Sequence, residues 1–195
     1  MPIIFKTLLV SFLTSSGITF GIDIYIGRKD VFAEYKKILK VSLENVAYSF
    51  PIFFFYEKRV EKRISEKNFL SVFFLWLTIT DVFFYIFHRL LHTRRFYKYH
   101  SLHHSYRLTF GPVALYSSFT EFIISNVLPN LISFEILNIG IDEIIKIIIF
   151  QIFYTVIVSH GGYSFLSQGH LKHHLTNKAP YGIFLTDRIV GRLIF

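Results

Sequence analysis

Residues 69–92 read FLSVFFLWLTITDVFFYIFHRLLH, an apolar run that leads directly into two histidines four residues apart. A helix needs about 20 mostly apolar residues to cross the hydrocarbon core of a bilayer, and the part from Phe69 to Phe87 meets that requirement. Residues four apart share a face of a helix, so His88 and His92 point the same way where the helix leaves the membrane. Because imidazole is the commonest metal ligand in proteins, we expect this membrane helix to end in a metal site.

The composition of the chain is typical of a membrane protein. Of 195 residues, 52% are hydrophobic, 24 are phenylalanine, and the mean hydropathy is +0.46. The net charge of +8 comes from basic residues between the apolar runs and at their ends, which suits anionic lipid head groups. No basic stripe with interleaved aromatic residues forms a nucleic-acid-binding module. The chain has no cysteine, so disulfides and thiolate metal sites are excluded and any site for a soft metal must rest on histidine.

Two further apolar runs precede the first one described. One extends from about Thr7 to Ile26 and contains Asp23, which weakens it as a membrane span. The other extends from about Ile38 to Tyr56, and Pro51 inside it predicts a kink because proline lacks the N–H that a helix interior requires. Residues 1–68 are therefore expected to form N-terminal membrane-spanning helices.

A fourth apolar block, from about Phe119 to Val158, separates the histidines into two stretches. Its centre, LNIGIDE at residues 137–143, has the composition of a turn. We interpret the block as a helical hairpin that leaves the histidine side of the membrane and returns to it, with shorter, partly re-entrant helices as the alternative. With three spans before the hairpin, most Lys and Arg residues lie on the histidine side, which favours the cytosol. The predicted fold is an all-α integral-membrane helical bundle with a histidine-rich helical cap on its cytosolic side.

All nine histidines lie within residues 88–104 and 160–174, and each stretch contains an HxxHH element. Positions i, i+3 and i+4 let two or three imidazoles converge from one helical turn. A single HxxxH pair is typical of a solvated helix face, but two HxxHH elements with all other histidines nearby favour a centre of more than one metal ion. The predicted ligands are His88, His92, His100, His103, His104, His160, His170, His173 and His174. Imidazole suits iron, zinc and copper, so the spacing leaves the metal open.

The helix that carries the first histidine pair also carries two residues expected to assist it. Asp81 and Tyr85 lie on the same stripe as His88 and His92 at helical spacing. A carboxylate inside an apolar span is costly unless it is paired. We expect Asp81 to accept the outer N–H of a metal-bound imidazole, which would fix the orientation of that ring.

The order and spacing of these elements resemble the fatty acid hydroxylase/sterol desaturase superfamily of integral-membrane, non-haem di-iron oxygenases. The matching elements are DVFFYIFHRLLH, HSLHH, SHGGY, HLKHH and a closing YGIFLTDRIVG, which together cover roughly residues 81–191. Residues 69–195 are therefore expected to be the catalytic region. The pair Phe110-Gly111 followed by Glu121 is similar to the sterol C4-methyl oxidase-like and cholesterol-hydroxylase-like branch. Ser118 stands where that branch has a histidine, and Pro180 replaces the usual asparagine before Tyr-Gly.

The resemblance implies a chemistry, a cofactor and partners. It implies two iron ions held by the nine histidines. It also implies an O2-dependent hydroxylation or desaturation of a lipid such as a sterol or a fatty acyl chain, and of these two reactions hydroxylation is favoured. The residues expected to assist the ligands are Asp81, Tyr85, Glu121, Tyr181 and Asp187. The chain has no Rossmann, flavin or haem motif, so electrons from NAD(P)H would arrive through a cytochrome b5-like or ferredoxin-like donor. The basic residues near the histidines suit either an acidic donor or anionic lipid.

Two other functions fit parts of the sequence. A catalytically silent family member that binds metal or lipid is the main alternative, and Ser118 motivates it. A metal transporter is disfavoured, because the histidines cluster at the ends of spans and after them rather than deep inside several spans. The expected location is the endoplasmic reticulum membrane in a eukaryote and the cell membrane otherwise.

Overall fold

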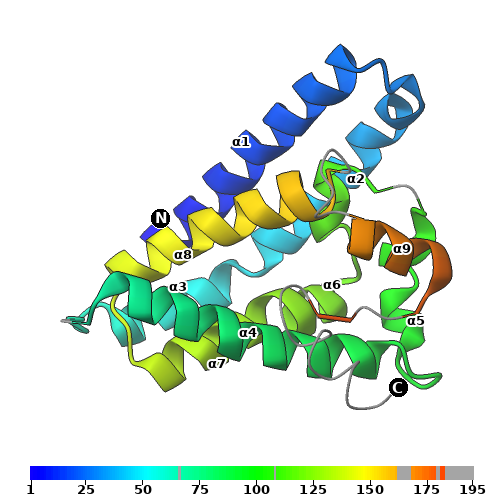
Figure 1. Ribbon diagram of the computed structural model, residues 1–195. Helices are drawn as coiled ribbons and strands as arrows, with labels where there is room; N and C mark the ends of the chain where they lie inside the picture. The colour runs from blue at the N-terminus through cyan, green and yellow to red at the C-terminus, as the bar shows by residue number, and fades with distance from the viewer. Residues whose placement is uncertain (66, 108, 162–167, 179–180, 183–195) are drawn as a thin grey trace.

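The protein is a bundle of helices with a helical cap at one end, and no strand occurs in the part of the chain that is described (Figure 1). The structure, a computed structural model, describes residues 1–65, 67–107, 109–161, 168–178 and 181–182. The prediction of an all-α membrane bundle is confirmed. Two helices are long and apolar enough to cross a bilayer, α1 (Ile3–Tyr25) and α4 (Phe69–Leu91).

A third candidate span is bent. It consists of α2 (Phe32–Tyr48) and α3 (Phe50–Val60), with a short 3-10 turn before α2, and the two parts meet at an angle of 42°. Pro51 lies in the first turn of α3, where no intrahelical partner requires its missing N–H. The predicted kink is therefore confirmed and lies directly beside the proline.

The apolar block between the histidine stretches forms the predicted hairpin. Asn138 makes the turn at a left-handed φ of 47°, as asparagine tolerates better than most residues. The first arm consists of α6 (Phe119–Glu121), the π-helical turn η4 (Phe122–Val127) and α7 (Leu128–Leu137). The second arm consists of α8 (Ile141–Phe153) and the π-helical turn η5 (Tyr154–Ser159). The second arm thus returns the chain to the end of the bundle where the first arm began.

Each arm of the hairpin packs against one membrane helix, α8 against α1 and α7 against α4 (Figure 1). On the α4–α7 side, the fully buried Trp76 donates its indole N–H to Oδ1 of Asn130 at 3.1 Å. One turn further along α4, the hydroxyls of Thr80 and Ser133 are 2.7 Å apart. Small and polar residues commonly join helices in membranes, where burial of apolar side chains gives little drive for association. These contacts fix the position of α4 and hence of its histidine end.

The histidine-bearing segments lie together at one end of the bundle, beyond the C-terminal end of α4 (Figure 1). Besides that end of α4, they are α5 (Tyr97–His100), η2 (His103–Ser105), the residue after η5, and α9 (Gln168–Thr176). The hairpin turn lies at the other end, where Arg59 and Arg63 bind the carboxylate of Glu135. The expectation that both histidine stretches share one face is confirmed, whereas the cytosolic orientation of that face stays a prediction.

Candidate metal centre

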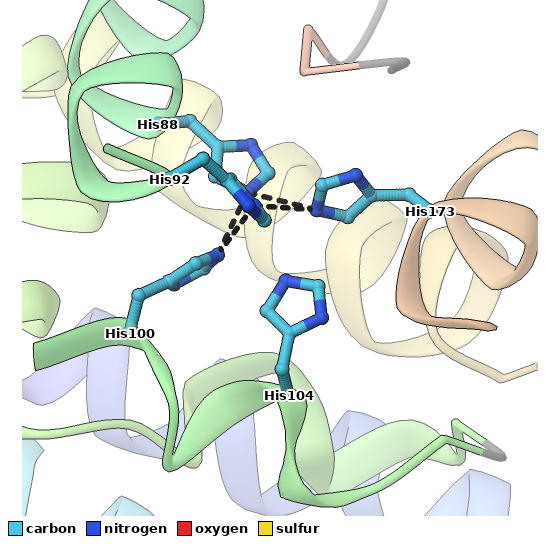
Figure 2. A group of neighbouring side chains, drawn as sticks. All are labelled: His88, His92, His100, His104 and His173. Carbon is cyan, nitrogen blue, oxygen red and sulfur yellow. Dashed lines mark hydrogen bonds between the residues drawn. The ribbon is translucent and has the colours of Figure 1, made fainter. Parts of the chain in front are cut away.

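The nine histidines converge in two adjacent sets, in each of which the candidate ligand nitrogens all lie within 4.8 Å of one another. The five-histidine set is His88, His92, His100, His104 and His173, drawn in Figure 2. The four-histidine set is His103, His160, His170 and His174. All nine predicted ligands are therefore brought together, and segments more than 80 residues apart in the sequence contribute to one set.

Each HxxHH element divides its histidines between the two sets, two in one and one in the other, and the sequence predicts that two or three imidazoles converge from one turn. His100 and His104 belong to the five-histidine set, whereas His103 belongs to the other. In the second element, His170 and His174 share the four-histidine set, and His173 joins the five-histidine set. Histidines four apart thus share a set. Successive residues of a helix point about 100° apart, so adjacent histidines can serve neighbouring ions.

The spacing of the Nε2 atoms matches that of ligands around one metal ion. In the five-histidine set, Nε2 of His88 is 3.1 Å from Nε2 of both His100 and His173. In the four-histidine set, Nε2 of His170 is 2.8 Å from that of His160 and 3.1 Å from that of His174. Neighbouring ligands at right angles around an ion with metal–nitrogen bonds of about 2.1 Å are about 3.0 Å apart. The observed distances therefore fit a shared ion.

The outer ring nitrogens determine which tautomer each histidine adopts. Nδ1 of His88 is 2.8 Å from the carbonyl oxygen of Tyr181, and Nδ1 of His173 is 2.7 Å from that of Lys178. Nδ1 of His100 is 2.6 Å from a carboxylate oxygen of Glu121. An oxygen acceptor requires the proton on Nδ1, which leaves a lone pair on Nε2. The Nε2 atoms of these rings therefore face one another as lone pairs at about 3 Å, an arrangement that a cation between them would stabilise.

The four-histidine set has the same arrangement. The carbonyl oxygens that face its outer nitrogens belong to Tyr116, Thr155 and Tyr106. They lie 3.2, 3.0 and 3.0 Å from Nδ1 of His103, His160 and His174, respectively. Sequence reasoning could not find these partners, because every residue has a carbonyl and only the fold decides which one meets an imidazole.

Burial keeps the imidazoles neutral, which is the form that binds a metal. Burial, reinforced by neighbouring histidines, lowers the pKa of His103 to about 4 and that of His160 to about 3, and it lowers the pKa of His170 well below the usual value. Both ring nitrogens of His104 are buried, and neither has a hydrogen-bond partner within the described part of the chain. A buried imidazole without a hydrogen-bond partner is costly, and coordination of a metal ion by His104 would remove that cost.

Glu121 is the carboxylate that holds an imidazole of the centre. It is 3% exposed, and its carboxylate accepts from His100, which is 1% exposed. Ser118, which stands where the related branch has a histidine, begins the helix that carries Glu121. Its Oγ accepts the backbone N–H of Glu121 at 3.2 Å and donates to the carbonyl of Tyr99 at 2.7 Å. Ser118 therefore acts as a helix cap that joins Glu121 to the segment of His100.

The other residues expected to assist the ligands lie at different distances from them. The ring of Tyr181 is 5.0 Å from that of His92, and it is the main-chain carbonyl of Tyr181 that meets His88. The hydroxyl of Tyr85 accepts from Arg89 at 2.8 Å. Asp81 is buried and lies close enough to Tyr154 to interact with it electrostatically. The roles of Asp81 and Tyr85 in the centre stay predictions, and Asp187 lies outside the described residues.

A family model described as fatty acid hydroxylase matches residues 73–192, which is more than half of the chain. The chain belongs to the fatty acid hydroxylase family. This family belongs to the fatty acid hydroxylase/sterol desaturase superfamily, and it is a family of iron-dependent oxidoreductases that process lipids. The two histidine sets and the membrane helices agree with membership of this family. The match begins inside α4 and leaves α1, α2 and α3 outside it.

Curated proteins with similar sequences bear related names. The chain is 32% identical over 123 residues to fatty acid hydroxylase domain-containing protein 2 of Macaca fascicularis and of Homo sapiens, covering 60% of this chain and 37% of each relative. It is 29% identical over 178 residues to fatty acid hydroxylase ahd1 of Mycosarcoma maydis, covering 80% of this chain and 45% of the relative. The chain thus spans less than half the length of these relatives. No solved structure matches it.

Proposed function

We propose that the protein is a membrane hydroxylase that uses O2 and two iron ions to oxidise an unactivated C–H bond of a lipid such as a sterol or a fatty acyl chain. The observation that carries this proposal is the pair of buried histidine sets whose Nε2 lone pairs face one another at about 3 Å. Hydroxylation is favoured over desaturation by the similarity of the Phe110-Gly111 to Glu121 segment to the oxidase-like branch.

Bound iron would supply the activation of O2, and the chain supplies the ligands, their orientation and the exclusion of water. The neutral imidazoles are available as ligands without loss of a proton, because burial lowers their pKa values. Glu121 and the main-chain carbonyls of Tyr181 and Thr155 hold individual rings from their outer nitrogens. Such contacts fix ring orientation and strengthen ligation.

A lipid substrate agrees with the position of the centre at the end of apolar helices. A small cavity of about 40 Å³ lies within the bundle, between α1, α3 and the two arms of the hairpin. Its lining is mostly apolar and includes Leu8, Phe53 and Ile148. It also includes Thr155, whose carbonyl oxygen accepts from His160. One residue of the cavity lining, Thr155, therefore contacts a candidate ligand of the four-histidine set.

The electrons would come from NAD(P)H through an external donor of the cytochrome b5 or ferredoxin type. The cap carries exposed basic residues, including Arg94, Arg95, Lys98 and Lys172. A positive surface attracts an acidic partner and speeds its association at low ionic strength. We therefore propose that turnover supported by an acidic donor slows as salt is raised.

The decisive experiment is lipid mass spectrometry on a host of known sterol and fatty-acid composition, with and without the protein. A lipid heavier by one oxygen atom supports hydroxylation, and one lighter by two hydrogen atoms supports desaturation. The matched control is His173→Ala, which removes a ligand of the five-histidine set. A product that appears equally with this variant, or no product at all, contradicts the proposal.

The alternative of a catalytically silent metal-binding member is tested by metal analysis of the purified protein. Near two irons per chain with O2 uptake supports the enzyme, and stoichiometric zinc without uptake supports the silent member. Ser118 motivates the silent member, yet its contacts give it a structural task and the nine histidines converge without a tenth.

The membrane location and the cytosolic orientation of the cap are tested by labelling. The chain has no cysteine, so an introduced cysteine such as Lys172→Cys is a unique reporter. Lys172 is exposed on α9. We expect a membrane-impermeant reagent to label it in opened membranes and not from the outer side of intact cells or from the lumen.

A further inference from the structure

A buried polar cluster lies at the end of α1 near the histidine cap. Asp23 is fully buried, and one of its carboxylate oxygens accepts from the hydroxyl of Tyr35 at 3.0 Å. The other carboxylate oxygen accepts from Arg28 at 3.4 Å. An unpaired carboxylate in a membrane helix is costly, and these two donors pair it. We call these three residues the Asp23–Arg28–Tyr35 cluster.

The guanidinium of Arg28 also reaches two main-chain carbonyls that belong to the cap. One of its nitrogens lies 3.4 Å from the carbonyl oxygen of Gly161, and another lies 3.3 Å from that of Thr109. Gly161 is the residue after His160. Thr109 comes three residues after Tyr106, whose carbonyl accepts from Nδ1 of His174. Arg28 therefore joins the two segments that place His160 and His174, both of which belong to the four-histidine set.

The backbone at the end of α1 is shaped to direct Arg28 toward these carbonyls. Gly27 has a φ of +75°, which glycine adopts without the strain of a side chain. The N–H of Arg28 donates to the carbonyl of Asp23 at 2.9 Å, and that of Gly27 donates to the carbonyl of Ile24 at 3.1 Å. This is the Schellman pattern of helix ends. It turns the chain so that Arg28 lies beside Asp23.

The five-histidine set is held by other parts of the chain. Its outer nitrogens meet Glu121 on α6 and the carbonyls of Tyr181 and Lys178, and the described residues show no contact of Arg28 with any of these three. The Asp23–Arg28–Tyr35 cluster therefore contacts the segments that carry the four-histidine set, whereas the five-histidine set is oriented by separate partners. It also lies in the N-terminal region, before the residues that match the family model.

We propose that Arg28, held by Asp23 and Tyr35, is a positioning residue that keeps the four-histidine set in its metal-binding geometry. Through it, the N-terminal membrane helices contribute to the metal centre without supplying a ligand. The proposal rests on the proposed two-metal function. Groups that hydrogen-bond directly to a metal ligand typically change metal affinity by about 10- to 100-fold, and Arg28 acts through the neighbouring main chain, so we expect an effect near the lower end of that range.

The test is metal binding by the full chain in detergent, measured by titration of Zn²⁺ against a competing chelator. The wild-type protein should bind two ions per chain. Arg28→Gln keeps a polar side chain but loses the fork that spans two carbonyls, so one binding step should weaken about 10-fold while the other stays unchanged. Arg28→Lys should fall between the two, because an ammonium keeps the charge without the fork.

Two controls assign the weakened step. Arg59→Gln removes an equivalent charge at the other end of the bundle, where Arg59 binds Glu135, and should leave both steps unchanged. His170→Ala removes a ligand of the four-histidine set, and adding Arg28→Gln to it should not weaken the remaining step further. An effect of Arg28→Gln in that background would overturn the proposal, since it would act on the five-histidine set.

The outcomes separate this proposal from the proposed function. If the wild-type protein binds fewer than two ions, the two-metal function fails. If it binds two ions, and Arg28→Gln weakens neither step or both steps equally, only the positioning role fails. Should Arg28→Gln not yield monodisperse protein, Tyr35→Phe decides by the same criterion, since it removes only the hydroxyl that hydrogen-bonds Asp23 and Thr19.

Discussion

Replacement of Glu121 by alanine should weaken metal binding by the five-histidine set and leave the four-histidine set intact. The carboxylate oxygen of Glu121 is 2.6 Å from Nδ1 of His100, and both side chains are almost completely buried. Leaving a buried donor without its partner costs about 1–3 kcal/mol, and water cannot easily replace a buried partner. Since about 1.4 kcal/mol corresponds to a tenfold change in an equilibrium constant, the affinity should fall about 10- to 100-fold.

Glutamine at position 121 separates the role of the charge from that of the hydrogen bond. Its amide oxygen can still accept the proton on Nδ1 of His100, whereas alanine offers no acceptor at all. Glu121→Gln should therefore weaken the same binding step by about 3- to 10-fold, less than Glu121→Ala.

The assay is again chelator competition with Zn²⁺, with lipid product measured in parallel. Glu135→Gln is the matched control, because Glu135 is a carboxylate at the far end of the hairpin whose partners are Arg59 and Arg63. It should leave metal affinity unchanged. If the affinity of Glu121→Ala for both ions stays within about twofold of wild type, the idea that this carboxylate orients His100 is refuted.

Three further predictions follow from the same contacts. The variants His103→Ala and His173→Ala should each abolish product and lower the bound metal by about one ion, because each removes a candidate ligand from a different set. Retained activity in both variants would contradict the ligand assignment. The metal-free protein should lose thermal stability as pH falls from about 6.5 toward 4. The reason is that the imidazoles of the unfolded chain protonate near pH 6.5, whereas the pKa values of His103 and His160 in the folded protein are about 4 and about 3. A melting temperature that does not change over this pH range would show that burial does not keep these imidazoles neutral. The variant Gly111→Ala should destabilise the fold by about 1–3 kcal/mol, because a Cβ at this position would lie 2.2 Å from Oγ1 of Thr19. Denaturant-induced unfolding measures the change in the free energy of unfolding. A variant as stable as wild type would mean that α1, which carries Thr19, can shift at no cost.

The membrane helices could be predicted from the sequence because each depends on local properties of the chain. Hydropathy and length indicate α1 and α4, and Pro51 indicates the bend between α2 and α3. The Leu137–Glu143 segment indicates the hairpin turn. Parity then places both histidine stretches at one end, which the convergence of the nine rings confirms.

The partners of several residues could not be predicted, because they come from distant segments. Asp23 counts against a membrane span when the sequence is considered alone, and the fold pairs it with Arg28 and Tyr35. The carbonyls that orient the rings leave no trace in the sequence, since every residue carries one. Glu121 is the exception, because its place after Phe110-Gly111 resembles the pattern of a branch of the superfamily and so makes it a candidate.

The number, type and spacing of the candidate ligands are properties of the sequence alone, since they depend on nine histidines at short intervals. The assignment of each ring to one of the two sets depends on how the helices pack. His103 and His104 are neighbours in the chain but belong to different sets, as do His173 and His174. Adjacent side chains diverge by about 100° on an α-helix and about 120° on a 3-10 helix, so the set that each one joins depends on which other segments lie on either side. That arrangement is set by the packing of α8 against α1 and of α7 against α4, which no local pattern encodes.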